Sequence, residues 1–310
     1  MAAKIGVIGA GRVGATVAYT LMLSGLVTEL VLVDVDQARA EGEAMDLADG
    51  TAFTGPIRIY AGEYADLNDA DIVIVCAGAS QRPGESRLDL VQRNYRVLGE
   101  VLTSLMGHWT DGVLLIVTNP VDVLTYAAFK ISGLPAGKVI GSGTVLDSAR
   151  FRHLLSLHAR VDVRNVHAYV VGEHGDSEVF LWSKATIAGV AIDEFCRYRG
   201  IPEPDREYIA ARVRRAAAEI IARKGATNYA VSLAVRRIVE AILHDQHSIL
   251  TVSGLVEGIY GLSSTCISLP SVVGSGGRQQ VLELPLDDAE REALYKSVQV
   301  LQAVQRQIGV

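Results

Sequence analysis

Apolar residues in the first half of the chain gather in short runs that are hydrophobic at consecutive positions. The runs span residues 4–10, 29–36, 57–60, 71–78, 113–119 and 138–141. The segments between them repeat apolar residues with the period of an α-helix. Strands that are apolar on both faces and alternate with helices are typical of a parallel sheet covered by helices on each side. The first half therefore predicts a doubly wound α/β fold.

The pattern changes after about residue 143. Long helical patterns and shorter strand patterns of antiparallel type follow, at residues 205–224, 227–245, 166–172 and 249–269. An acidic turn near Asp287 precedes apolar residues at the spacing of an amphipathic helix, at Leu294, Val298, Leu301 and Ile308. Because no charged or low-complexity linker separates the halves, we predict two closely apposed domains. They are a doubly wound domain over residues 1–142 and an α+β domain over residues 143–310.

The composition of the chain argues against several classes of binding partner. The 310 residues carry a formal net charge of -6, which argues against nucleic-acid binding because that needs a surplus of cations. The cysteines, Cys76, Cys196 and Cys266, are far apart and lack ligand spacing, so we expect reduced thiols and no metal site. The sequence shows no leader-like start and no apolar stretch of bilayer length. We therefore expect no membrane association and a cytoplasmic location.

A glycine motif follows the first predicted strand directly and opens the first predicted helix. Gly9 permits a tight turn, Gly11 lets the backbone approach a pyrophosphate, and Gly14 lets helix and strand pack closely. Asp34 ends the second predicted strand, where a carboxylate accepts hydrogen bonds from ribose hydroxyls and repels a 2′-phosphate. This context predicts a Rossmann-type site for NAD. The cofactor-binding residues that we expect are Gly9, Gly11, Arg12, Val13, Gly14, Asp34, Gly78, Ala79 and Asn119.

Three later segments carry groups suited to the reduction of a small keto acid. Hydride transfer to a ketone needs a proton donor, a positive group at the carbonyl and an anchor for the substrate carboxylate. His174 can donate the proton, with Asp147 as the carboxylate that fixes its tautomer. Arg150 has a planar guanidinium that can pair with a carboxylate through two hydrogen bonds. Arg87 lies in a Pro/Gly-containing loop that can close over the substrate.

Each of these residues alone is typical of an ordinary loop or helix surface. Their occurrence together behind a dinucleotide fold favours an NAD-dependent dehydrogenase. The alternative from another class is a non-catalytic NAD-binding sensor. A sensor has no need of His174, Asp147, Arg87 and Arg150 together, so the enzyme is the better interpretation.

The motifs GAGRVG, VLVDVD, GASQRPGESRLDL, VTNPVDV, GSGTVLDSARFR, GEHGDSEV and KGATNYA cover essentially the whole chain. In this combination the sequence resembles the lactate/malate dehydrogenase family. The resemblance implies His174 as proton donor and acceptor, with Asp147 as its partner. It implies Arg150 as the carboxylate anchor and Arg87 as the mobile, carbonyl-polarising residue.

The resemblance also adds two pocket residues. Asn119 would hydrogen-bond near the carbonyl and the nicotinamide, and Thr227 would line the substrate pocket. Their ordinary interpretations are a strand-end turn before Pro120 and a helix N-cap near residue 227. The implied substrate-binding set is Gln81, Arg87, Asn119, Arg150 and Thr227.

Gln81 separates the subgroups of the family. Malate enzymes similar to this chain carry Arg at that position to pair the second carboxylate of oxaloacetate, whereas lactate enzymes carry Gln. A neutral Gln81 tolerates a methyl group and leaves a buried second carboxylate unpaired. Gly84-Glu85 is also of lactate type. We expect interconversion of pyruvate and L-lactate, with malate or a branched-chain 2-hydroxy acid as alternatives.

Arg152 and His167 resemble a pair that, in many bacterial members of the family, lines a subunit-interface site for fructose 1,6-bisphosphate. Symmetry-related copies of the pair would repel each other when empty, and phosphate would relieve that repulsion. The same pair also occurs in members that need no activator, so the pair is compatible both with regulation by fructose 1,6-bisphosphate and with its absence. The resemblance further implies a homotetramer.

Overall fold

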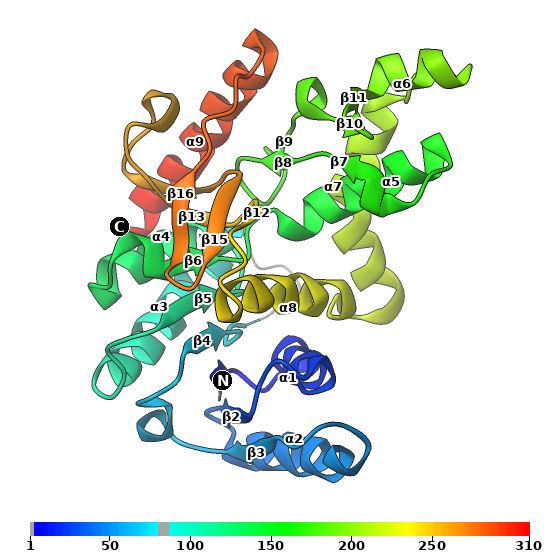
Figure 1. Ribbon diagram of the computed structural model, residues 1–310. Helices are drawn as coiled ribbons and strands as arrows, with labels where there is room; N and C mark the ends of the chain where they lie inside the picture. The colour runs from blue at the N-terminus through cyan, green and yellow to red at the C-terminus, as the bar shows by residue number, and fades with distance from the viewer. Residues whose placement is uncertain (1–2, 80–86) are drawn as a thin grey trace.

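The computed structural model describes residues 3–79 and 87–310. Within these ranges, none of the helices has both the length and the apolarity needed to cross a membrane. Figure 1 shows one continuous body in which the N-terminal half forms the lower layers and the C-terminal half the upper ones.

An eight-stranded sheet forms the centre of the protein, in the order β14-β13-β6-β5-β4-β1-β2-β3. Its parallel strands come from the first half: β1 (Lys4–Ile8), β2 (Glu29–Val33), β3 (Arg58–Ala61), β4 (Ile72–Val75), β5 (Val113–Ile116) and β6 (Val139–Gly141). The strand order reverses between β1 and β4, so ligands are expected in the crevice beyond the carboxyl ends of these strands.

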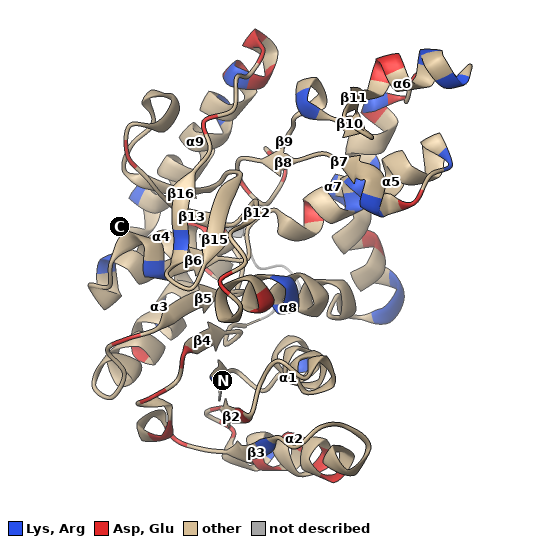
Figure 2. Ribbon diagram, in the orientation of Figure 1, with Lys and Arg blue, Asp and Glu red and all other residues tan. Residues whose placement is uncertain are grey.

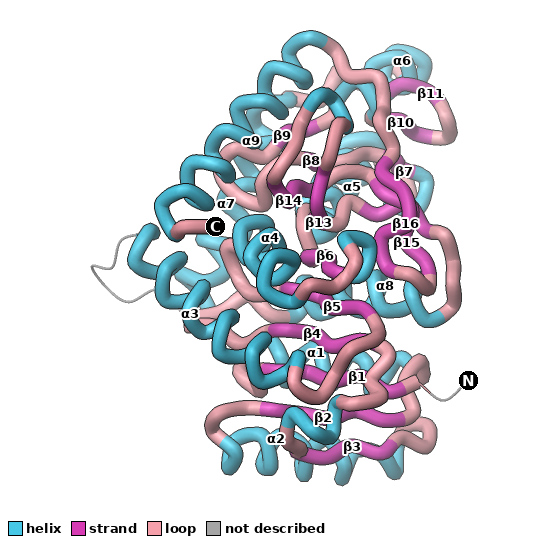
Figure 3. Tube along the Cα trace, turned by 90° about the vertical axis from the view of Figure 1, so that its left-hand side faces the viewer, coloured by secondary structure: helices cyan, strands magenta, loops and turns pink. Residues whose placement is uncertain are grey.

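Helices cover both faces of this sheet (Figure 3). They are α1 (Arg12–Ser24), α2 (Gln37–Asp49), α3 (Arg87–Met106), α4 (Val121–Ser132) and α8 (Tyr229–Leu243). One hydrophobic cluster joins α1, α2 and α8 to the sheet, and a second joins α3 and α4 to the opposite face. Strands with helices on both sides must be apolar at consecutive positions, which is why β4 reads Ile-Val-Ile-Val and is buried throughout.

The second half adds helices around smaller sheets. The helices are α5 (Val145–Ala159), α6 (Ile192–Arg199), α7 (Arg206–Lys224) and α9 (Asp288–Ile308). The short strands are β7 (Val166–His167), β8 (Val170–Val171), β9 (Val179–Phe180), β10 (Thr186–Ile187), β11 (Val190–Ala191), β12 (Ser248–Leu250), β15 (Ser271–Gly274) and β16 (Gly277–Val281). The side chain of Asp287 accepts a hydrogen bond from the backbone N–H of Glu290 and so caps α9.

The predicted doubly wound sheet and its six parallel strands are confirmed. Several strands end earlier than their apolar runs, since the chain leaves the sheet at Val75 and Ile116 to form the loops that carry the site. Two strands of the predicted antiparallel region, β13 (Ser253–Val256) and β14 (Thr265–Ser268), extend the main sheet instead of forming a separate one. The second half therefore completes the sheet on which the first half is built.

Candidate active site

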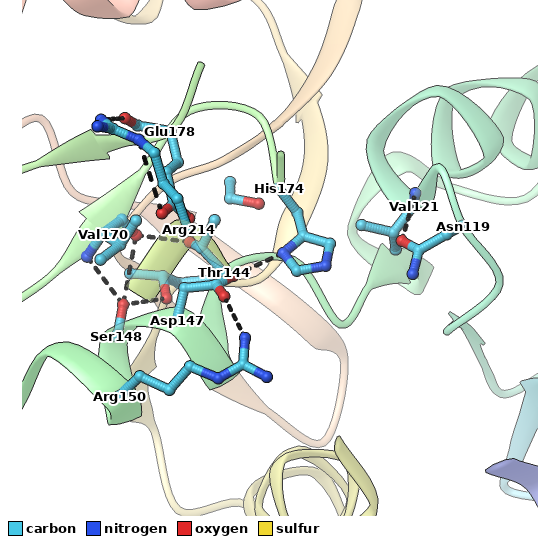
Figure 4. A network of polar contacts seen from close by, with 12 residues as sticks. Asn119, Val121, Thr144, Asp147, Ser148, Arg150, Val170, His174, Glu178 and Arg214 are labelled. Atoms are coloured by element: carbon cyan, nitrogen blue, oxygen red, sulfur yellow. Dashed lines mark hydrogen bonds and ion pairs between the residues drawn. The ribbon is translucent and has the colours of Figure 1, made fainter. Parts of the chain in front are cut away.

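His174 and Asp147 form the central contact of the site (Figure 4). Nδ1 of His174 lies 2.6 Å from Oδ2 of Asp147, and Oδ1 of Asp147 accepts a hydrogen bond of 2.9 Å from Arg150. Asp147 is only 2% exposed, so its charge depends on these two partners. The three residues that the sequence assigned to proton transfer and carboxylate binding are thus brought together.

Local folding explains why these segments meet. Asp147 and Arg150 are separated by one helical turn on α5 and therefore lie on the same face. Ser148 donates to and accepts from the backbone of Val170 on β8, and Thr144 also donates to the Val170 carbonyl. These buried contacts fasten the start of α5 to β8, directly before the loop that carries His174.

The electrostatics of the pair favour a protonated imidazole. Burial alone lowers the pKa of His174, but the charge of Asp147 and the hydrogen bond to it, with contributions from Asp122 and Glu178, raise it to about 9. Burial raises the pKa of Asp147, whereas His174 and Arg150 together bring it below its ordinary value. An imidazolium beside a carboxylate is therefore the resting form near neutral pH. Since Asp147 engages Nδ1, Nε2 is the nitrogen that can exchange a proton with a substrate.

Arg150 borders a cavity of about 400 Å³ between α5 and α7. Its side chain is 15% exposed, so it is held in place and still accessible. Leu154, Val213 and Ile220 supply apolar walls to the same cavity. Arg212 and Arg223 add two further cations to its lining, and Glu219 adds one carboxylate. Basic residues also recur along α7, as the blue segments of Figure 2 show. A small anion with an apolar group suits this chamber.

Asp122 is a site residue that the sequence analysis missed. Its Oδ2 accepts the backbone N–H of His174 at 2.7 Å, and its Oδ1 accepts the hydroxyl of Ser268 at 3.1 Å. Burial raises the pKa of Asp122 to about 6 in spite of these hydrogen bonds. Asp122 lies three residues after Asn119, in the first turn of α4. It therefore connects the predicted pocket residue Asn119 to the loop of the proton donor.

Some of the remaining predicted substrate residues lie outside the part of the chain that the structure describes. Gln81 lies outside the described residues, as do Gly84 and Glu85. Arg87 begins α3, and its side chain also lies outside the described part of the chain. Thr227 is half-buried in the link between α7 and α8. It is not the helix cap that was its alternative interpretation, because the N-cap of α8 is Asn228.

A second cavity, of about 600 Å³, opens at the carboxyl ends of the parallel strands. Five of the predicted cofactor residues line it: Gly9, Gly11, Asp34, Gly78 and Ala79. Arg12, Val13 and Gly14 form the first turn of α1 beside it, and Asn119 follows β5 without lining it. Asp34 also holds the glycine turn, since its Oδ2 accepts the backbone N–H of Ala10 at 2.6 Å.

The glycine turn fits a dinucleotide in its backbone geometry. Gly9 has φ of 98°, and a Cβ there would lie 2.5 Å from the backbone nitrogen of Ala77. A Cβ on Gly14 would lie 1.8 Å from the carbonyl oxygen of Gly9, whereas a Cβ on Gly11 meets no atom of the described residues within 4 Å. Gly9 and Gly14 are thus required by packing, and Gly11 keeps open the space in front of the helix N-terminus. That space suits a pyrophosphate.

Substitution of Gly11 should therefore affect ligand binding, whereas substitution of Gly14 should affect stability. We expect Gly11→Ala to weaken NADH binding by about tenfold or more, which is about 1.4 kcal/mol, without changing the free energy of unfolding. We expect Gly14→Ala to lower the free energy of unfolding by about 1–3 kcal/mol, because the added methyl collides with backbone. Calorimetric titration with NADH and urea denaturation measure both effects.

The exposed Gly42 on α2 offers a matched control, since a Cβ there also meets nothing within 4 Å. Gly42→Ala should bind NADH as the wild type does. Equal NADH affinity of Gly11→Ala and wild type would contradict the assignment of this cavity.

Comparison with known proteins agrees with this geometry. Residues 3–141 match the model of the lactate/malate dehydrogenase NAD-binding domain. Residues 144–308 match the model of the alpha/beta C-terminal domain of the same family.

Among curated relatives, an L-lactate dehydrogenase of Acetivibrio thermocellus is 52% identical over 309 residues, covering 99% of this chain and 98% of that protein. An L-lactate dehydrogenase of Moorella thermoacetica is 50% identical over 311 residues, covering 99% and 98%. A solved structure, the ligand-bound minor L-lactate dehydrogenase of Enterococcus mundtii, is 40% identical. It superposes with a TM-score of 0.95 over 98% of both chains. Matches of this extent in sequence and structure show that the chain belongs to the lactate/malate dehydrogenase family.

Proposed function

We propose that the protein is an NAD-dependent L-lactate dehydrogenase that interconverts pyruvate and L-lactate, the last step of anaerobic glycolysis. The observation that carries this proposal is the buried Asp147 holding both His174 and Arg150, at 2.6 and 2.9 Å. A proton donor and a carboxylate anchor are two of the three groups that reduction of a 2-keto acid requires, the third being the positive group at the carbonyl. The relatives named L-lactate dehydrogenase, about half identical over nearly the whole chain, support the same reaction.

NAD supplies hydride transfer when it is bound. The cavity lined by Gly9, Gly11 and Asp34 would hold its pyrophosphate and adenosine ribose. The carboxylate of Asp34 at this place favours NAD over NADP, because a 2′-phosphate would face a like charge. Gly78, Ala79 and Asn119 would contact the cofactor at the ends of β4 and β5.

The substrate would bind through Arg150, whose guanidinium pairs with the pyruvate carboxylate. In pyruvate reduction, Nε2 of His174 donates its proton to the ketone oxygen, and in lactate oxidation it takes the hydroxyl proton back. Asp147 stabilises the imidazolium throughout and keeps Nδ1 protonated. Arg87 polarises the carbonyl from the start of α3, and Asn119 donates a further hydrogen bond. Thr227 lines the pocket beside the methyl group.

Malate and branched-chain 2-hydroxy acids are the substrates that compete with lactate within the family. Gln81 argues against malate, since it offers no charge to a second carboxylate. A sensor that only registers NAD is disfavoured by the paired His174 and Asp147.

Substrate preference tests this assignment. Purified protein should oxidise NADH rapidly with pyruvate and slowly with oxaloacetate. Gln81→Arg should shift the ratio of kcat/KM toward oxaloacetate by roughly 100-fold or more, because a buried carboxylate gains a counter-charge. Gln307→Arg, which adds the same charge at an exposed position near the end of α9, should leave the ratio unchanged. Wild-type preference for oxaloacetate would contradict lactate specificity, and inactivity with every keto acid would favour the sensor.

Assembly as a homotetramer is part of the proposal. Its support is an apolar groove on the outside of α1 and α8, with walls that include Tyr19, Leu23, Tyr229 and Leu233. These side chains are each at least half exposed, which is costly for an isolated subunit. Division into domains at residues 142 and 143, and a cytoplasmic location, remain predictions from the sequence.

We also propose fructose 1,6-bisphosphate as an effector at Arg152 and His167. Arg152 lies on α5, two residues after Arg150. The helix α5 packs against β7, which carries His167. Burial and the nearby Arg237 lower the pKa of Arg152 in spite of Tyr169, so a phosphate would relieve an unfavourable charge. His167 is exposed and available to the same ligand.

The effector should lower the apparent KM for pyruvate by about fivefold or more, as expected for coupling of about 1 kcal/mol or above. Arg152→Ala should abolish the response, whereas Arg197→Ala, at an exposed position on α6, should retain it. Steady-state kinetics with and without the effector decide the matter, and a wild type that does not respond overturns the effector site.

A further inference from the structure

Glu178 is a buried acid that the proton-transfer scheme above does not use. It lies directly before β9, four residues after His174, and is 3% exposed. Among residues 3–79 and 87–310, its Oε1 is buried without a hydrogen-bond partner. The cation beside it is Arg214 on α7, whose Nε lies 4.0 Å from Oε1. A buried carboxylate with an unfilled acceptor is costly to keep, so its position calls for a functional reason.

Charged groups from three segments face Glu178. Asp147 and Arg150 on α5, His174 on its own loop and Arg214 on α7 all interact electrostatically with Glu178. Of these residues, Arg214 lies beside the Glu178 side chain (Figure 4). Burial and the charge of Asp147 raise the pKa of Glu178 to about 8, although His174, Arg214 and Arg150 oppose the change. Arg214 compensates only in part, because its side chain is 39% exposed and its contact is long.

Arg214 is itself well fixed. Its Nη2 donates a 2.9 Å hydrogen bond to the backbone carbonyl of Glu178, and its guanidinium lies 5.1 Å from the ring centre of Phe180. These contacts tie α7 to the strand after the His174 loop. The same helix borders the cavity of Arg150, so one element contacts both the acid and the substrate chamber.

We propose that Glu178 is a positioning residue whose charge, balanced by Arg214, determines how firmly the Asp147–His174 pair holds its proton. Glu178 and His174 interact electrostatically, so loss of the Glu178 proton adds a second negative charge near the pair. The new negative charge stabilises the imidazolium, so His174 stays protonated to higher pH than Asp147 and Asp122 alone would allow. This inference rests on the proposed proton transfer, and its consequence is pyruvate reduction that persists into alkaline solution.

The protonation of His174 can be measured without turnover. Diethyl pyrocarbonate reacts with neutral imidazole, and His174 is 26% exposed in its side chain. We would measure the rate at which the reagent modifies His174 at a series of pH values by peptide mass spectrometry. The pH at which this rate is half of its maximum is the midpoint for deprotonation of His174. Glu178→Gln should lower this midpoint by about one pH unit, because one nearby negative charge is lost. Glu178→Met removes the same charge without an amide and should give the same shift, and Glu178→Asp should restore the wild-type midpoint.

Glu173→Gln serves as the matched control. Glu173 adjoins His174 in sequence, but its carboxylate accepts hydrogen bonds from Ser177 and not from the pair. In Glu173→Gln, the midpoint for modification of His174 should equal that of the wild type. The alkaline limb of kcat/KM for pyruvate should move by the same amount as the modification midpoint in each variant.

An unchanged midpoint in both folded Glu178→Gln and Glu178→Met overturns the inference, as does a similar shift in Glu173→Gln. Failure of the proposed function has a different signature. In that case the modification midpoints shift as described while pyruvate is not turned over at any pH.

Discussion

The short hydrogen bond between His174 and Asp147 is the contact on which the rest of the site depends. A carboxylate that is 2% exposed is stable only when its oxygens are paired, and Asp147 uses one oxygen for His174 and the other for Arg150. The cost of burying this charge therefore fixes His174 and Arg150, the proposed proton donor and carboxylate anchor, relative to each other. Removing either partner would leave a buried charge with too few hydrogen bonds.

The fold supports this contact from both halves of the chain. Buried hydrogen bonds from Thr144 and Ser148 to Val170 hold the start of α5 against β8. From the other half, Asp122 in the first turn of α4 holds the backbone of His174. The same α4 follows the loop of Asn119, at the edge of the sheet where the glycine turn and Asp34 form the second cavity. The proposed cofactor cavity and the His174–Asp147 pair are thus connected through short, buried contacts.

The sequence predicted those parts of the site that depend on residues close together in the chain. The sequence alone predicts three features: the strands that are buried on both faces, the glycine turn, and the spacing of one helical turn between Asp147 and Arg150. Asp122 and Glu178 were missed because their partners are distant in sequence: His174 lies 52 residues from Asp122, and Arg214 lies 36 residues from Glu178. Only the fold brings such pairs together. The sequence predicted antiparallel strands in the second half but not that β13 and β14 join the main sheet, because a hydrophobic pattern does not reveal which strand is the neighbour.

The pH dependence of kcat/KM in both directions tests the central claim most directly. Pyruvate reduction requires protonated His174, so kcat/KM should be constant near neutral pH and fall above about pH 9. Lactate oxidation requires the neutral imidazole, so its kcat/KM should rise through the same range. Opposite trends with one shared midpoint are the result that the account predicts. Parallel trends in the two directions, or a midpoint unaffected by Asp147→Asn, would contradict His174 as the group that exchanges the proton.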